Sequence, residues 1–197
     1  AHVDGRMIAI TEGAGGRVIN RDRMWHYVEG LENWNPIWQN HGIRVLRGPS
    51  SLWFGARGTR LPPPLYPGFD TLGTLAHIMS TGYEYSWFVL TRKIIEKEFA
   101  LSGSEQNPDL TGKSWLQVFK RRGAGVPKPV QAFLDHGRDF VQAASVAELA
   151  GKMNALAGSD LIDAGRLERE IVARDRQIDH PFGKDLQVQA IRAARTY

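Results

Sequence analysis

Three consecutive prolines at positions 62–64 constrain the fold of this chain more than any other feature. They follow two short segments, the mostly apolar residues 51–54 and residues 59–61, which the glycine-bounded turn 55–58 joins as a hairpin. Proline cannot donate a ladder hydrogen bond and holds its segment extended, so the sheet must stop at this point. The first half of the chain therefore has room only for small antiparallel sheets.

Helix signals increase toward the C-terminus. Asp70 is placed to cap one helix, and Ser145 with Glu148 three residues later forms a capping box for another. Pro181 and Gly183 end the last long helix. We expect helices at 5–15, 71–80, 91–101, 115–122, 130–140 and 145–156, and a last long helix that carries Leu167, Ile171 and Ile178. Strands are expected at 17–20, 43–46 and 87–90, and a turn at 107–109. The predicted fold class is α+β, with small antiparallel β elements and several helices.

Composition excludes several classes of function. The 197 residues include no cysteine, which rules out disulfides, thiolate metal sites and a cysteine nucleophile. The net charge of +4 comes from 25 basic and 21 acidic residues that alternate in sign, a pattern typical of solvated helices rather than nucleic-acid surfaces. No apolar stretch approaches the ~20 residues of a membrane span, and no signal peptide opens the chain. A cytoplasmic protein without a nucleic-acid partner is predicted.

Other catalytic signatures are missing from the sequence. The six histidines show no paired ligand spacing, so no metal site is predicted, and no Gly-x-Ser-x-Gly elbow suggests a hydrolase. The chain opens on Ala1 and leads directly into an apolar helical pattern. We expect it to be an internal piece of a longer protein.

Three blocks, in order, carry a resemblance to a known family. Residues 2–16 resemble a Gly-Asp-Gly, methionine, Ala-Gly-Ala helix, and residues 47–61 resemble an Arg-Gly, apolar strand, Gly-x-Arg-Phe block. Residues 141–184 resemble a closing "xA, ELA, helix, DPxFG" pattern. The order is that of FAD-dependent dehydrogenases of the fumarate reductase, succinate dehydrogenase and 3-ketosteroid dehydrogenase type. The chain is most similar to the ketosteroid-dehydrogenase-like FAD-binding dehydrogenases.

The resemblance implies an architecture. Residues 1–20 correspond to an exit helix and strand of the flavin domain, 21–183 to a capping or substrate domain, and 184–197 to the start of the return to the flavin domain. Asp4 and Gly5 are then cofactor-binding positions. No Gly-x-Gly-x-x-Gly follows a predicted strand. The glycines at 13–16 lie at the end of a helix, whereas a pyrophosphate binds to the backbone amides at the start of one. We therefore expect FAD in the full-length parent, no tight binding to this piece, and no activity of the piece alone.

The family's chemistry implies candidate catalytic residues. The flavin exchanges a hydride with one carbon, and a protein group handles the proton on the next. Arg47 matches an arginine of the fumarate reductase proton path; it could also steady a carboxylate, or be an ordinary surface arginine. The family's proton donor aligns with Gly68 here, and the fumarate reductase Thr-Glu pair aligns with Ile43-Arg44, which disfavours that activity. Tyr66, two residues before Gly68, is the candidate acid or base.

Four further residues are candidates for the site. His26 occupies roughly the place of a substrate-binding histidine in the family. The alternative is a packed, hydrogen-bonded histidine among aromatic residues. Trp25 and Tyr27 belong to an aromatic stretch, residues 24–38, that either forms an apolar wall for a flat substrate or covers the face turned toward the flavin domain. Arg60 matches the arginine of the Gly-x-Arg-Phe turn, with a structural role as the favoured interpretation.

The sequence thus predicts the substrate-covering part of an FAD-dependent oxidoreductase. Its substrate is an apolar or steroid-like ketone, dehydrogenated or reduced at the carbon–carbon bond next to the carbonyl. Its partners are the FAD-binding domain of the same parent chain and the small apolar substrate. The alternative is a stand-alone ligand- or protein-binding module without redox activity. Substrate identity, reaction direction and electron acceptor stay open.

Overall fold

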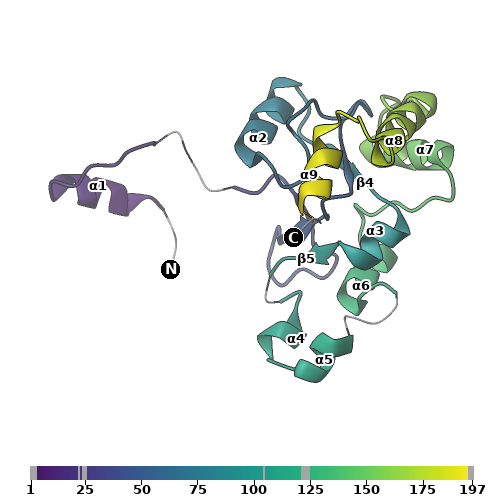
Figure 1. Cartoon of the computed structure of the whole chain (residues 1–197). Helices are drawn as coiled ribbons and strands as arrows, with labels where there is room; N and C mark the ends of the chain where they lie inside the picture. The colour runs from purple at the N-terminus through teal and green to yellow at the C-terminus, as the bar shows by residue number, and fades with distance from the viewer. Residues whose placement is uncertain (1–3, 22, 24–25, 104, 121–124, 195–197) are drawn as a thin grey trace.

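A computed structural model describes residues 4–21, 23, 26–103, 105–120 and 125–194 of the chain (Figure 1). Helices and strands occur together without a parallel sheet among these residues, so the α+β prediction is confirmed. In chain order the elements are α1 (Arg6–Gly13), β1 (Gly30–Glu32), β2 (Gly42–Leu46), β3 (Leu52–Gly55), α2 (Thr71–Ser80), β4 (Ser86–Val89), α3 (Arg92–Lys97), β5 (Ala100–Leu101), α4 (Pro108–Thr111), α5 (Trp115–Lys120), α6 (Lys128–His136), α7 (Val146–Ala157), α8 (Ala164–Ile178) and α9 (Leu186–Ala194).

Two small antiparallel sheets organise the body of the molecule. One has the strand order β1-β2-β5, with Leu31 opposite Ile43 and Val45 opposite Leu101. The other pairs β3 with β4, with Trp53 opposite Phe88. The predicted hairpin is present as a bridge from Phe54 to Arg60, after which the prolines leave the sheet as expected.

Strand β3 is buried on both faces, which explains why its sequence is a continuous apolar run. Leu52 and Phe54 face α7 and α8, where Met153 and Leu167 complete the cluster. Trp53 points to the other face and packs with Leu61 and Ile78. Because successive side chains of a strand point to opposite faces, residues 52–54 contribute to two separate apolar clusters. β3 therefore joins the C-terminal helices to α2 and the proline-rich segment.

A third apolar cluster supports the first sheet. Ile43 and Val45 of β2 pack with Phe99, Leu101, Val130 and Phe133, the last two from α6. That helix begins at Lys128, two residues before the predicted start, with Pro129 in its first turn, where a missing amide costs nothing.

Two predicted caps are present. Asp70 accepts a hydrogen bond from the Gly73 amide at 2.8 Å, and α2 spans the predicted 71–80. Ser145 accepts from the Glu148 amide at 3.2 Å at the start of α7. Local side-chain chemistry was sufficient to fix these helix starts.

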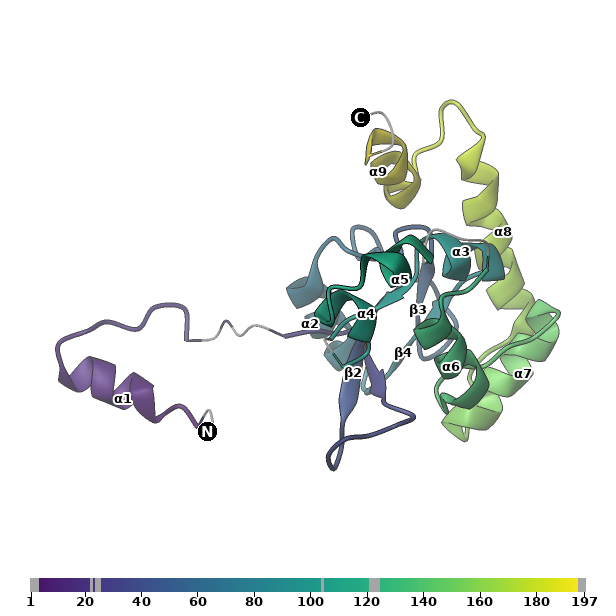
Figure 2. The ribbon, with the colours of Figure 1, turned by 90° about the horizontal axis from the view of Figure 1, so that it is seen from below.

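The N-terminal helix stands apart from the rest of the chain. α1 buries none of its residues, and both views show it away from the body (Figures 1 and 2). The predicted strand at 17–20 is wrong: these residues form no ladder, because no other described segment lies beside them to pair with.

Two other predictions were wrong in detail. The helix expected to run to Leu101 ends at Lys97, and Ala100–Leu101 forms β5 because β2 offers them an edge. The turn expected at 107–109 is instead the start of α4, where the Asn107 amide group donates to the Leu101 carbonyl at 2.8 Å. α9 was not predicted.

No helix in the described part of the chain is long and apolar enough to cross a membrane.

Candidate functional site

The segment of residues 61–70, here called the proline loop, is the centre of the candidate site. Tight backbone hydrogen bonds shape it, from the Leu65 amide to the Pro62 carbonyl at 2.9 Å and from the Tyr66 amide to the Pro64 carbonyl at 2.8 Å. Leu61 and Leu65 anchor it to the cluster around Trp53. The loop therefore has a defined shape on which Tyr66 and Gly68 are displayed.

Arg47 lies under this loop in a buried ion pair. It follows β2 and is 5% exposed. Its Nη1 is 2.6 Å from Oε1 of Glu29, a carboxylate that is also fully buried. The Arg44 Nε lies 3.7 Å from the other oxygen of Glu29. The Val45 amide donates to the Glu29 carbonyl at 3.0 Å, which holds the acid beside β2. One carboxylate thus faces two guanidinium groups.

Part of the Arg47 guanidinium is left without a partner. Nε and Nη2 are buried and make no hydrogen bond to any of the described residues. Nη2 is 4.0 Å from the position that a Cβ of Gly68 would occupy. Burial lowers the pKa of Arg47, the charge of Glu29 opposes that shift, and Arg44 adds to it. Arg47 is therefore a cation with spare donors at the edge of the proline loop.

Arg60, on the other side of the loop, has both terminal nitrogens in hydrogen bonds. It forms a two-pronged contact with the Asp185 carboxylate, in which Nη2 donates to Oδ1 at 3.2 Å. Nη2 also donates to Oε1 of Gln187 at 2.7 Å. Gln187 donates in turn to the carbonyls of Pro49 and Ser51, both at 2.7 Å. Arg60 therefore ties the start of α9 to the strand region.

Asp185 is both the partner of Arg60 and the start of α9. It accepts a hydrogen bond from the Val188 amide at 3.0 Å. Burial raises its pKa, but the hydrogen bonds from Arg60 and from that amide, together with the charges of Arg60 and Arg174, outweigh burial, and the net pKa lies below the ordinary value. The carboxylate is thus held in its charged form.

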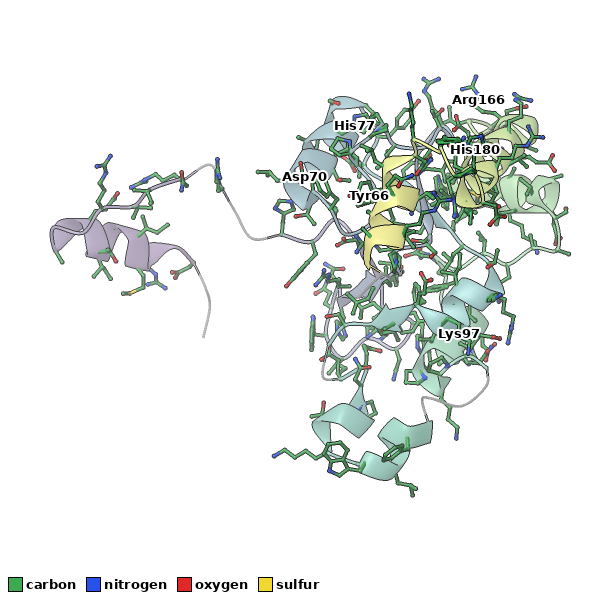
Figure 3. All side chains as sticks on the ribbon, viewed as in Figure 1. Tyr66, Asp70, His77, Lys97, Arg166 and His180 are labelled. Carbon is green, nitrogen blue, oxygen red and sulfur yellow. The ribbon has the colours of Figure 1, made fainter. Side chains whose placement is uncertain are left out.

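Tyr66 lines a hollow of about 200 Å³ between the proline loop and α9. Figure 3 shows Tyr66 beside α9 and Asp70 at the start of α2. The Tyr66 ring packs 5.1 Å from the ring of Phe69. The walls combine apolar and charged residues: Arg60, Leu61, Pro62, Pro63, Leu65, Tyr66, Glu170, Asp185, Leu186 and Gln187. Two predicted site residues, Tyr66 and Arg60, therefore share one cavity.

His26 reaches the far end of the same loop. Its Nε2 lies 3.3 Å from the carbonyl of Thr71, the residue after the N-cap of α2. Tyr27 is half exposed, and the Arg44 guanidinium lies 4.0 Å over its ring. Trp25 is outside the described residues. The structure thus places His26, Arg47, Arg60 and Tyr66 around one segment.

The aromatic stretch does not form one continuous wall among its described residues. Trp34 packs edge-on against Phe133, and Trp38 stacks on His41 with ring centres 3.8 Å apart. The buried His41 ring orders this turn, since its Nδ1 accepts from the Ile37 amide at 3.2 Å. The contacts of these rings therefore stabilise the turn that connects β1 and β2.

The two predicted cofactor positions do not make a flavin site by themselves. Gly5 has a φ of +77° at the start of α1, and nothing lies within 4 Å of the place where its Cβ would be. Asp4 is exposed and pairs with Arg6, whose side-chain hydrogen bond lowers the Asp4 pKa. A dinucleotide pyrophosphate needs a strand, a glycine turn and a helix start enclosing it. Asp4 and Gly5 offer only the helix start.

The described part of the chain holds no group of three or more His, Asp or Glu side chains placed to hold a metal ion.

Sequence reasoning missed Glu29, Asp185 and Gln187. An aspartate directly before an apolar helix pattern was a usable capping signal for Asp185. Glu29 carried no such signal, because its partner Arg47 lies 18 positions away and only the β1–β2 pairing brings the two together.

Comparisons with known proteins place the chain in one family. A family model described as "FAD binding domain" matches residues 1–196. A "KsdD-like steroid dehydrogenase" of Mycolicibacterium smegmatis is 58% identical over the whole chain, and two Mycobacterium tuberculosis proteins of the same description are also 58% identical. The chain spans 36% of the first relative and 35% of the other two. No solved structure matches it significantly.

Proposed function

Because the chain belongs to the FAD binding domain family, we propose that it forms the substrate-covering part of an FAD-dependent dehydrogenase. The proposed reaction introduces or reduces a carbon–carbon double bond next to the carbonyl of an apolar, steroid-like ketone. The observation that carries the proposal is the 58% identity over all 197 residues to the KsdD-like steroid dehydrogenase. The matched region covers the whole chain and so includes the proline loop and the positions of both flanking arginines.

The internal division of the chain is part of the proposal. Residues 1–20 belong to the flavin domain, 21–183 form the capping or substrate domain, and 184–197 begin the return. The separation of α1 from the body supports a boundary near residue 20 (Figure 2). The family model treats residues 1–196 as one unit, so it draws no such boundary.

Tyr66 is the proposed acid or base of the reaction. In enzymes of this type the flavin exchanges the hydride, so the remaining requirement is a group for the proton on the neighbouring carbon. Tyr66 lines a cavity whose walls combine apolar and charged residues, and an apolar ketone needs both an apolar surface and a few polar groups to orient it.

Arg47 is the proposed electrostatic partner of that chemistry. Its unpaired Nη2 adjoins Gly68, two residues from Tyr66, and the adjacent Trp53 and Phe88 rings exclude water from it. A buried cation stabilises negative charge that develops on an oxygen or phenolate nearby far better than an exposed one.

The other predicted residues have supporting roles. His26 holds the end of the proline loop through Thr71, and contact with a substrate oxygen remains its proposed function. Arg60 orders the loop and α9 through Asp185 and Gln187, since these contacts engage both of its terminal nitrogens. Tyr27 and Trp25 remain proposed substrate contacts.

A direct test uses the protein expressed from its complete reading frame and loaded with FAD. Mixing with a panel of ketosteroids should bleach the flavin absorbance, and dicarboxylates should not. Tyr66→Phe should slow bleaching by about 100-fold or more, the usual size of a general acid–base contribution. Tyr83→Phe is the matched control, because Tyr83 is also half-buried but contacts Arg57 instead of the loop. Equal rates for both variants would remove Tyr66 from the mechanism.

A further inference from the structure

The buried carboxylate of Glu29 lies behind the candidate site and is not among the residues that line the hollow beside Tyr66. Its side chain is fully buried, with Oε1 2.6 Å from Nη1 of Arg47 and Oε2 3.7 Å from Nε of Arg44. Removing two charged groups from water costs about as much free energy as their attraction returns, so stability alone does not explain a buried ion pair. The geometry around Arg47 gives the acid a second role.

Three contacts fix the orientation of the Arg47 guanidinium. Glu29 holds Nη1, and the ring centres of Trp53 and Phe88 lie 5.5 and 5.6 Å from the guanidinium carbon. These two rings pack on each other with their centres 4.6 Å apart, so they form one wall. Because a guanidinium is planar, holding Nη1 also sets the direction of the edge formed by Nε and Nη2. Nη2 on that edge lies 4.0 Å from the place of a Gly68 Cβ.

We infer that Glu29 is a positioning residue, which holds Arg47 so that its Nε–Nη2 edge faces the proline loop at Gly68. The inference rests on the proposed function, in which Arg47 stabilises negative charge that develops at the site. The backbone fixes the acid in turn, because the Val45 amide donates to the Glu29 carbonyl at 3.0 Å where β1 and β2 pair. Sheet pairing therefore determines where the free donors of Arg47 point.

A double-variant cycle on the FAD-loaded protein from its complete reading frame tests the inference. Flavin bleaching by a ketosteroid is measured in the parent, Glu29→Gln, Arg47→Met and the double variant, as a limiting rate and a half-saturating concentration. Glu29→Gln keeps the size of the side chain and removes its charge. The limiting rate should fall by about tenfold or more, while the half-saturating concentration changes by less than about twofold.

The Arg47→Met background separates positioning from a general effect on the fold. There, Glu29→Gln should change the limiting rate by less than about twofold, because a residue that acts only through Arg47 has nothing left to position. Glu29 keeps Arg44 as a partner in this background. Glu29→Asp retains the charge one methylene further back, and it provides the same comparison if the glutamine variant does not fold. Equal slowing in both backgrounds, or a parent-like rate in Glu29→Gln, would overturn the inference.

Asn154→Ala is the matched control for a purely structural loss. The Asn154 side chain on α7 makes two hydrogen bonds to the backbone of Ile162, both at 3.0 Å. This variant should melt at a lower temperature than the parent and bleach at the parent's rate. Slowing in Asn154→Ala as large as in Glu29→Gln would count against positioning, because lost stability would then account for both.

Crystal structures separate this inference from the proposed function. The Nε–Nη2 edge of Arg47 should face Gly68 in the parent and turn away from it in Glu29→Gln, whether or not a ketosteroid bleaches the flavin. An unchanged guanidinium in the variant rules out the positioning role. A parent protein that no ketosteroid bleaches rules out the proposed function, while the two structures still decide the role of Glu29.

Discussion

Arg47 and Arg60 flank the same loop but have opposite surroundings. Arg60 is partly exposed and donates to Asp185 and Gln187. Arg47 is buried, is paired with Glu29 at one nitrogen, and keeps Nε and Nη2 without partners among the described residues. A guanidinium with occupied donors holds structure together. A buried guanidinium with unsatisfied N–H donors lowers the stability of the fold, and such groups are typical of functional sites.

The largest expected effect comes from removing the acid beneath the loop. Glu29→Ala leaves the charge of Arg47 buried without compensation, which should lower the free energy of unfolding by about 3–5 kcal/mol. Urea denaturation measures this loss. The double variant Glu29→Leu/Arg47→Met should recover most of it, because apolar replacement removes both charges. No recovery in the double variant contradicts the buried-pair interpretation.

A smaller effect should separate the two arginines by activity. Arg47→Lys keeps a positive charge near Glu29 but lacks the free Nε and Nη2 edge, so flavin bleaching by a ketosteroid should slow by about tenfold or more. Arg60→Lys should change the rate by less than about threefold. Similar rates for both variants would falsify the functional distinction between them.

The Arg60 contact should depend on pH. Because the Asp185 pKa is lowered in the folded state, its stabilisation is complete above the unfolded pKa of about 3.9 and is lost as pH falls through the lower folded value. Asp185→Asn should therefore cost about 1–2 kcal/mol at neutral pH, and progressively less below about pH 4. Thermal melts across pH measure the difference. Glu32→Gln, in an exposed ion pair with Arg138, should cost under about 0.5 kcal/mol.

The smallest effect concerns the glycine above Arg47. Gly68 has a φ of +88°, so Gly68→Ala should cost about 1 kcal/mol from backbone strain, although its new Cβ has space. Gly82→Ala, with a φ of +76° and open surroundings, is the control for strain alone. Calorimetry should show similar losses for both. A slower reaction in Gly68→Ala only would place the reacting atoms beside Arg47.

Much of the fold was predictable because its signals are local. The caps at Asp70 and Ser145 and the hairpin before the prolines depend on residues within a few positions of each other. The strand at 17–20 and the helix through Ala100 were mispredicted because propensity is weak where pairing decides. Ala100–Leu101 is a strand only because β2 lies beside it.

The candidate site was predictable only in part. Resemblance to a family identified Tyr66, Arg47, Arg60 and His26, and the structure places all four around the proline loop. It could not identify Glu29 or Gln187, because their roles come from contacts across 18 and 127 positions of sequence. Buried polar contacts of this kind depend on packing, which no local pattern encodes.

The sequence alone determined the α+β class, the break in the sheet at the prolines and the helix starts, since turn chemistry, proline geometry and capping act over a few residues. Only the tertiary structure decided which arginine has free donors, since that depends on which carboxylates the sheet pairing and α9 bring within reach. It also decided that Trp115, Leu116 and Phe119 stay exposed, because burial is a property of what packs nearby and not of the residue itself.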